Sequence, residues 1–235
     1  MFDITYNGIS PSDLGCWLAT IPIITPSQVI RTRQTVVGMD GELLGTDDSY
    51  GDAQIDFTIH AKSTTLQAIS RNIRKWLTGT GTLVISDHND SFYEVKEVNY
   101  TTYLKKDEAY GRIAVSMKVY PYEFLNSGEE WISSFPISNT AMLCKPLYRI
   151  VGSSSSAQGT LTVRGNTITY TVGGRGADQT IYIDTRRKIT YNANGVSREG
   201  YISGDYEDLW LPTGSNAISA TIGSVSVKTR WGYRI

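Results

Sequence analysis

Residues 63–79 read STTLQAISRNIRKWLTG and form the segment of the chain with a clear helical period. Apolar residues recur in it at the three- and four-residue spacing of one helix face. Thr64 and Gln67 have the spacing of a capping box, and Gly79 can end the helix in a left-handed conformation. The pattern predicts an amphipathic helix over about 63–78 that packs one face against a sheet. The predicted core face is Leu66, Ile69, Ile73, Trp76 and Leu77.

Strand patterns surround this helix. Residues 55–61 read IDFTIHA, residues 82–85 read TLVI and residues 92–100 read FYEVKEVNY. Apolar or alternating runs of this length, bounded by turn residues, are typical of strands. We therefore expect the helix to belong to a β domain that spans residues 1–135.

The remainder of the chain has no helical period. Residues 136–146 are polar, with a proline at each end, and are expected to be a linker. From residue 147 on, short strand candidates alternate with turn residues, as in a β-sandwich. Gly165 with Asn166 is expected to form one tight hairpin turn, because both residues accept a positive φ. The predicted fold class is mainly β: an N-terminal β domain with one amphipathic helix, a linker, and a C-terminal β-sandwich over 147–235.

Composition excludes several classes of protein. Charged residues make up 19% of the 235 residues and the formal net charge is -1, so the chain has no strong field that attracts nucleic acid. We therefore expect no sequence-specific nucleic-acid binding. No apolar run reaches the roughly 18 residues of a membrane-spanning helix, and no secretion signal is visible, so we expect no membrane insertion. Cys16 and Cys144 are too few for a disulfide framework or a zinc cluster, and we expect reduced thiols.

Residue types used in catalysis are sparse. The two histidines, His60 and His88, have neither a metal-ligand spacing nor a cysteine partner close in sequence. His88 lies in the stretch SDHNDS, which is expected to be a hairpin loop, with a small cation site as the alternative. We therefore expect a protein that is not an enzyme and that holds neither a cofactor nor a metal.

Two acidic clusters are explained most simply by turn chemistry. The first lacks the alternating ligand register of an EF-hand. The second lacks the spacing of a glycan-cleaving enzyme, which needs two carboxylates facing each other across a groove. The first cluster is Asp40, Glu42, Asp47 and Asp48, and the second is Asp205, Glu207 and Asp208.

Several motifs resemble one protein family. Residues 36–41 read VVGMDG ahead of the helix, residues 75–79 read KWLTG at its end, and the next strand candidate ends in the pair SD. In this order they resemble the N-terminal domain of the distal tail proteins (Dit family) of long-tailed siphophages. Residues 201–223 are similar to the second half of the galectin-like domain that follows in many of these proteins. The resemblance implies a galectin-like fold for the C-terminal sandwich.

The resemblance also implies a structural part of a bacteriophage virion. Such a distal tail protein, at the baseplate hub, forms a hexameric ring that joins the tail tube to the tail-tip or receptor-binding apparatus and leaves a channel for DNA. The expected partners are other copies of the chain, in one ring or in stacked rings, the tail tube protein, and a tail-associated lysin or fibre hub protein. A receptor-binding protein and host glycans are further candidates. The expected location is the tail tip of the virion, after assembly in the host cytoplasm.

A ring that closes by rotation needs strands or arms that contact the neighbouring subunit. Residues 25–51 are the candidate arm, because the tip MDGE and the polar run GTDDSYGD suit an exposed projection. A hairpin that is exposed to solvent and contacts no neighbour is the alternative. Whether the residues WGYRI at 231–235 return to the N-terminal domain is left open by the sequence.

Aromatic residues support an alternative function, a carbohydrate-binding module that aids adhesion to the host surface. The chain has 15 Tyr and 5 Trp, and exposed aromatic rings can stack on sugars. Trp210 and Trp231 are the candidate glycan-stacking residues, with burial in the sandwich core or an interface as the alternative. Galectins use a histidine in their sugar site, and no histidine follows His88 in this chain. A galectin-type sugar site is therefore not expected.

Overall fold

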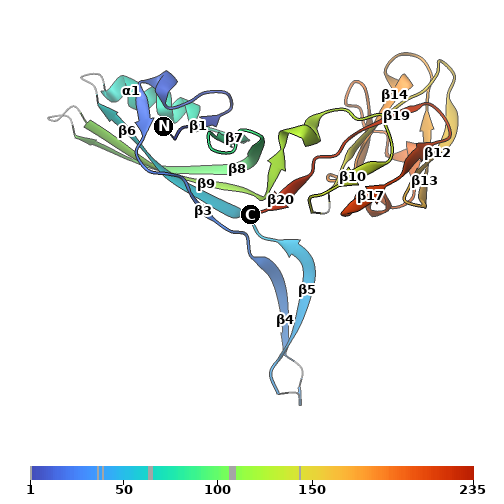
Figure 1. Ribbon diagram of the computed structural model, residues 1–235, viewed down its shortest axis with the longest axis horizontal. Coiled ribbons are helices and arrows are strands. Elements are labelled where there is room, and N and C mark those ends of the chain that lie inside the picture. Colours follow the sequence, from blue (N-terminus) through green and yellow to red (C-terminus); the bar gives the residue numbers. More distant parts are fainter. Residues whose placement is uncertain (1, 36, 39, 63–65, 106–109, 143) are drawn as a thin grey trace. The chain divides into compact units, whose positions relative to one another are not determined.

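The computed structural model shows a mainly β fold with two units, each built around its own core (Figure 1). The first unit contains residues 1–123 together with 234–235, and the second contains residues 124–233. Within the described chain, no helix is long and apolar enough to cross a membrane. The residues that the structure describes are 2–35, 37–38, 40–62, 66–105, 110–142 and 144–235.

A sheet of eight strands forms the first unit, in the order β1-β7-β8-β9-β6-β2, with β3 paired to β6 and β20 paired to β9. Strands β6 and β9 run antiparallel and place Ile55 opposite Met117 and Phe57 opposite Val115. Because side chains alternate between the two faces of a strand, these residues share one buried face. The elements are β1 (Ile4–Tyr6), η1 (Ser12–Leu14), β2 (Cys16–Leu18), β3 (Ile23–Thr25), β6 (Ala53–Lys62), β7 (Gly81–Ile85), β8 (Ser91–Lys105), β9 (Tyr110–Leu125) and β20 (Gly232–Arg234).

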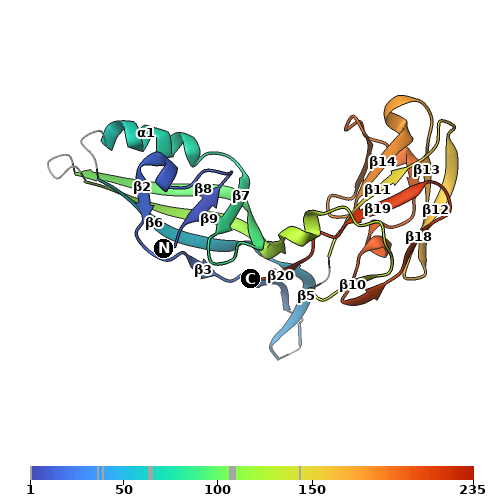
Figure 2. The same ribbon diagram turned by 45° about the horizontal axis from the view of Figure 1, so that its top comes forward.

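Helix α1 (Leu66–Trp76) covers one face of this sheet (Figure 2). Of the predicted core face, Leu66, Ile73, Trp76 and Leu77 are buried, and Ile69 is half-buried against the same core. The Trp76 indole N–H donates a hydrogen bond of 2.9 Å to the carbonyl oxygen of Tyr6. The Trp76 ring also meets the Tyr6 ring edge-on at 6.2 Å between centroids. The predicted cap residue Thr64 lies outside the described residues.

Residues 234 and 235 belong to the first unit, although residues 124–233 form the second. The backbone N–H of Ile235 donates to the carbonyl of Pro121 at 3.1 Å, and the Ile235 side chain packs against the first core. The chain therefore returns to the first unit at its last two residues. This answers the question that the sequence left open.

Two four-stranded antiparallel sheets make the second unit a β-sandwich, with strand orders β15-β14-β11-β19 and β16-β13-β12-β18. Their inner faces share one core, in which the buried Tyr148 hydroxyl donates to the Leu209 carbonyl at 2.7 Å. The elements are η3 (Asn126–Glu129), β10 (Ile137–Asn139), β11 (Leu147–Val151), β12 (Ala157–Val163), β13 (Asn166–Val172), η4 (Gly176–Gln179), β14 (Thr180–Asp184), β15 (Ile189–Asn192), η5 (Glu199–Tyr201), β16 (Ile202–Ser203), η6 (Tyr206–Leu209), β17 (Gly214–Asn216), β18 (Ile218–Ala220) and β19 (Ser224–Lys228).

The unit boundary differs from the predicted one. Residues 136–146 are not a linker, because the second unit begins at Phe124. Strand β10 pairs with β17, and Ile132 forms a bridge with Val227. The turn-rich residues predicted to be a linker therefore pair with strands far away in the sequence and pack as part of the sandwich.

The hairpin turn between β12 and β13 lies one residue earlier than predicted. Val163 pairs with Asn166, so the turn residues are Arg164 and Gly165, with φ of 52° and 92°. A primed two-residue turn requires positive φ at both positions. The register places apolar residues of both strands in the core, and this packing decides the position of the turn.

The two thiols should react slowly in the folded protein. Both cysteines are buried and free, and burial raises the pKa of Cys16 to about 11 and of Cys144 to about 12. The raised pKa keeps each group as the neutral thiol up to higher pH, and the thiolate is the reactive form. At pH 8 we expect labelling at least ~100-fold slower than in urea, where the pKa is near 8.5. Time courses with Ellman's reagent measure this ratio, and labelling at equal rates with and without urea would contradict it.

Candidate functional site

The arm is a two-stranded antiparallel ribbon of β4 (Val29–Thr35) and β5 (Glu42–Tyr50) (Figure 1). No third strand among the described residues pairs with it. Every β4 residue after Val29 is exposed. The arm is shorter than the predicted segment 25–51, because Thr25 is the last residue of β3 and pairs with β6. Both outer edges of the ribbon therefore offer backbone groups to another chain.

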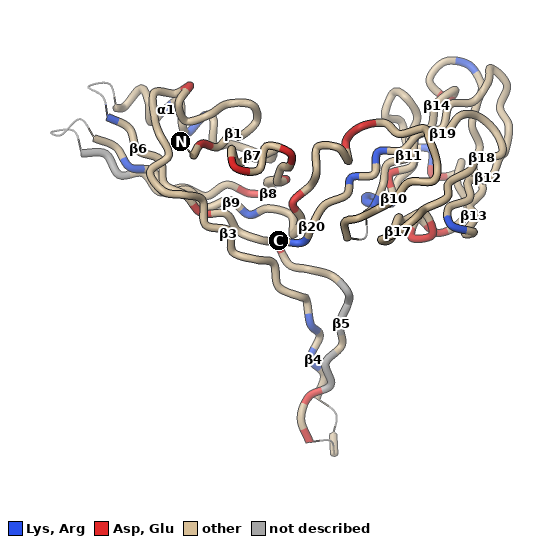
Figure 3. The backbone as a smooth tube through the Cα atoms, viewed as in Figure 1, with Lys and Arg blue, Asp and Glu red and all other residues tan. Residues whose placement is uncertain are grey.

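Charge along the arm is mixed, with basic residues on β4 and acidic residues nearer the tip (Figure 3). Arg33 and Glu42 approach to 3.5 Å, but both side chains are largely exposed. An exposed pair of this kind contributes little to stability. The acidic side chains expected at 47 and 48 lie outside the described side chains.

Residues 234 and 235 hold the base of the arm. The Ile235 carbonyl accepts hydrogen bonds from the backbone N–H and the hydroxyl of Ser27, at 3.3 and 3.0 Å. The Arg234 guanidinium lies 4.6 Å from the centroid of the Tyr50 ring. A backbone hydrogen bond of 2.8 Å from Gly51 to Gln28 closes the ribbon. The base is thus fixed to the first unit by groups far apart in the sequence.

Large apolar side chains are exposed along the segment that leads into the arm. Trp17, Ile21 and Ile23 are 42%, 61% and 65% exposed, and Ile30 is 45% exposed. Strands β2 and β3 pair only with β6 among the described strands, so they form an edge of the sheet. Apolar exposure at a free edge is typical of a surface that contacts another chain. An open groove extends from this edge over β6, β9 and β8, and its lining includes Thr20, Ile23, Asp56, Asn99, Thr101 and Ser116.

The predicted glycan-stacking residues do not form a common platform. Among the described rings, Trp210 and Trp231 are not in contact with each other. The ammonium of Lys145 lies over the Trp210 ring, 4.5 Å from its centroid. The Trp231 indole donates to Ser127 at 3.2 Å, and its ring packs against the sandwich core. Sugar stacking by these two rings stays a prediction.

The histidines contact protein groups. The Tyr110 hydroxyl lies 3.0 Å from a ring nitrogen of His60, and burial, then Arg112, lowers the pKa of that imidazole. His88 lies in a turn, with Nδ1 3.0 Å from a carboxylate oxygen of Glu123. Within the described part of the chain, no group of three or more acidic, histidine or cysteine side chains could hold a metal ion. The acidic residue Glu207 forms an ion pair with Lys188, which chiefly lowers its pKa.

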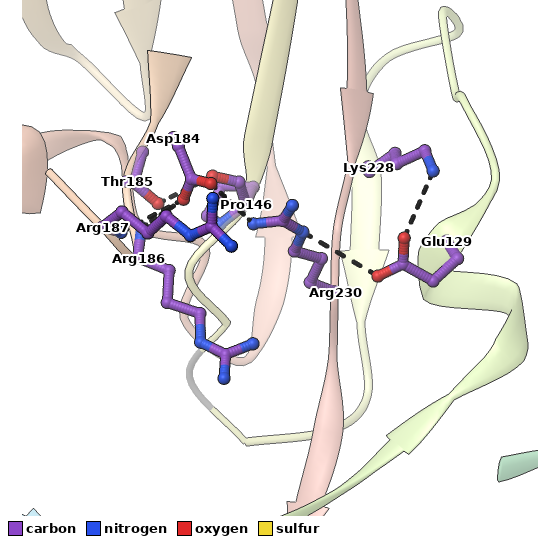
Figure 4. A network of polar contacts seen from close by, with 8 residues as sticks. All are labelled: Glu129, Pro146, Asp184, Thr185, Arg186, Arg187, Lys228 and Arg230. Atoms are coloured by element: carbon purple, nitrogen blue, oxygen red, sulfur yellow. Dashed lines mark hydrogen bonds and ion pairs between the residues drawn. The ribbon is translucent and has the colours of Figure 1, made fainter. Parts of the chain in front are cut away.

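A chain of alternating charges joins distant parts of the second unit (Figure 4). Lys228 donates to Glu129 at 3.2 Å, Arg230 lies 3.8 Å from the same carboxylate, and Arg230 donates to Asp184 at 3.1 Å. The side chain of Asp184 is 2% exposed. Its other oxygen accepts the backbone N–H groups of Arg186 and Arg187, both at 3.1 Å. This carboxylate therefore orders the turn that follows β14.

The sequence matches no model of a known protein family and no curated protein. A solved structure is similar over nearly the whole chain: the SPP1 Dit protein (gp 19.1), described as a paradigm of the hub adsorption apparatus in phages that infect Gram-positive bacteria. The similarity has a TM-score of 0.70, covers 97% of each chain and comes with 15% sequence identity. At this identity the likeness concerns the fold, and both units take part in it.

Proposed function

We propose that this chain is a structural virion protein of a bacteriophage, a distal tail adaptor at the baseplate hub. The likeness of both units to the SPP1 Dit fold, over 97% of each chain, carries the proposal. In this role six copies form a ring with a channel for DNA, and the ring joins the tail tube to the tail-tip or receptor-binding apparatus. The role requires binding surfaces and neither catalysis nor a cofactor.

The first unit is the ring-forming part in this proposal. A ring closes when one surface of a subunit meets a different surface of the next by a repeated rotation. Among the described strands none pairs with the outer edges of the arm, and the neighbouring edge strands carry exposed apolar side chains. Strand addition to such edges is a common mode of association. The arm and the edge β2–β3 are therefore the proposed contacts between copies.

The second unit is the proposed docking platform for a lysin, fibre hub or receptor-binding protein. A sandwich with its own core can project from a ring without contributing to closure. The proposed location is the virion tail tip, after assembly in the host cytoplasm. The tail tube protein is a further proposed partner of the ring.

Removing the arm tests the proposal. Gln28 and Gly51 are joined by a backbone hydrogen bond of 2.8 Å, so residues 29–50 can be replaced by a short Gly-Ser link. The full chain is expected to form rings of six copies of 26.0 kDa, or 156 kDa, and the shortened chain is expected to stay monomeric, with a mass below 26.0 kDa. Light scattering over a range of concentrations, with negative-stain imaging, measures both.

Two controls keep this test decisive. The β4 side chains after Val29 are exposed, so the shortened chain should keep the thermal transition of the full chain, which shows that the first unit still folds. The substitution Arg164→Gln changes an exposed turn of the second unit and should leave the mass of the ring unchanged. A full chain that is monomeric at every concentration, also when mixed with tail tube protein, would contradict the proposal.

A further inference from the structure

Four basic residues lie at one end of the sandwich, and the function proposed above does not use them. Lys145 precedes β11, and Arg186, Arg187 and Lys188 follow β14 in the turn to β15. We call these four residues the basic cluster. The chain as a whole has a net charge of -1, so the basic cluster is a local concentration of positive charge.

Hydrogen bonds between the segment before β11 and the turn after β14 bring Lys145 close to the other three basic residues. The backbone N–H and the hydroxyl of Thr185 both donate to the carbonyl of Pro146, at 3.2 and 2.8 Å (Figure 4). Pro146 follows Lys145 directly, so these bonds hold Lys145 beside the turn. Asp184 fixes the turn itself by accepting two backbone N–H groups. The cluster is therefore built on ordered backbone.

The charges that act on Lys145 also place it close to the basic residues of the turn. Burial lowers the pKa of this ammonium, and the charges of Lys188 and Arg186 lower it further, whereas Glu207 raises it. Glu207 forms an ion pair with Lys188. By contrast, the neighbouring network sets Lys228 and Arg230 against two carboxylates. Among the described contacts of the cluster, Glu207 thus balances one charge, that of Lys188.

An aromatic ring lies next to these charges. Trp210 follows η6, is partly exposed, and carries the Lys145 ammonium over its ring at 4.5 Å. Arg187 and Lys188 are exposed in the turn. Guanidinium and ammonium groups bind phosphate and sulfate oxygens, and tryptophan contacts the C–H faces of sugars. The two recognition elements match the two parts of an acidic sugar polymer.

We propose that the basic cluster, together with Trp210, binds an anionic polysaccharide that carries phosphate or sulfate esters. Nucleic acid fits less well, because strong binding to it draws on roughly 6–10 phosphate contacts or on a series of exposed stacking rings. This site differs from the pair of tryptophans considered from the sequence, since it includes Trp210 but not Trp231 and depends on charge. It also does not depend on the ring.

Matched variants test the site in the full-length protein. Arg187→Gln with Lys188→Gln removes two charges from the cluster, and Arg164→Gln with Arg175→Gln removes two exposed charges from other turns of the same unit. Lys188 and Arg164 both have positive φ, of 54° and 52°, so the two positions are also matched in backbone conformation. Fluorescent dextran sulfate is the probe, and uncharged dextran of equal length is its control. Fluorescence anisotropy gives the affinities.

The expected result is binding of dextran sulfate and not of dextran, weakened about tenfold in the cluster variant and less than about twofold in the control variant. Equal loss in both variants would show an effect of net charge alone and would overturn the site. Tighter binding of a thymidine oligonucleotide or of polyglutamate at the same concentration of charge would overturn the assignment to a polysaccharide. Light scattering on the same samples shows whether the ring forms, so a loss of polysaccharide binding can be told apart from a loss of ring assembly.

Discussion

Trp76→Ala is expected to lower the free energy of unfolding of the first unit by about 3–5 kcal/mol, the usual cost of removing a large buried aromatic side chain. Trp76 is 7% exposed and packs in the first core. The substitution removes the edge-on contact with Tyr6 and the hydrogen bond to its carbonyl. The cavity would separate the end of α1 from β1, so the backbone amides of α1 should exchange their hydrogens faster as the first unit loses stability.

Hydrogen exchange measured by mass spectrometry suits this test, because a chain of two units need not unfold in one step. Peptides that cover 66–77 should exchange faster in Trp76→Ala, whereas peptides of the second unit should keep their rates. Trp76→Phe keeps a ring and should lose about 1–2 kcal/mol, less than the alanine variant. Arg71→Ala lies on the exposed face of the same helix and serves as the control. A Trp76→Ala protein with unchanged exchange would contradict the burial of this face.

Asp184→Ala is expected to destabilise the second unit by about 3 kcal/mol, because the guanidinium of Arg230 loses its nearer, buried carboxylate and keeps the more distant Glu129, at 3.8 Å. The side chains of Asp184 and Arg230 are 2% and 20% exposed. The substitution also frees the backbone N–H groups of Arg186 and Arg187. Since the same turn carries Arg186, Arg187 and Lys188 of the basic cluster, the variant should lose binding of dextran sulfate as well as stability.

Asp184→Asn separates the two contributions. The amide oxygen can still accept from the turn, but the charge opposite Arg230 is gone, so we expect a smaller loss of about 1–2 kcal/mol. Urea denaturation followed by circular dichroism, with exchange of peptides from 180–192, measures both variants. Asp205→Ala, an exposed acidic residue of the same unit, is the control. Equal stability of the alanine and asparagine variants would show that the hydrogen bonds to the turn contribute nothing, whereas an asparagine variant as stable as the unchanged protein would show that the ion pair contributes nothing.

Local patterns predicted the elements that depend on neighbours in the sequence. The period of apolar residues marked α1, whose predicted face is buried at Leu66, Ile73 and Trp76. The alternating runs marked β6, β7 and β8. A helix or strand repeats its geometry every few residues, so the side chains that must share a face are visible as a spacing.

The basic cluster and the exposed apolar edge could be recognised only in part from the sequence. Residues 185–188 read TRRK, and a basic turn could be recognised from that run alone. Its fourth cation, Lys145, comes from a segment that looked like a linker. The exposed apolar residues Ile21 and Ile23 look like core residues in the sequence, because nothing local shows that their strand lies at an edge.

By itself the sequence determined a mainly β chain with one amphipathic helix and a second β unit, and it offered a candidate arm and motifs that resemble the Dit family. Only the tertiary structure decided that the second unit begins at Phe124, that Ile235 returns to the base of the arm, and that Lys145 joins the turn after β14. The first set follows from periodicity, which arises among residues a few positions apart. The second set depends on hydrogen bonds and burial between residues 39 to 208 positions apart, and these form only when the sheets pack.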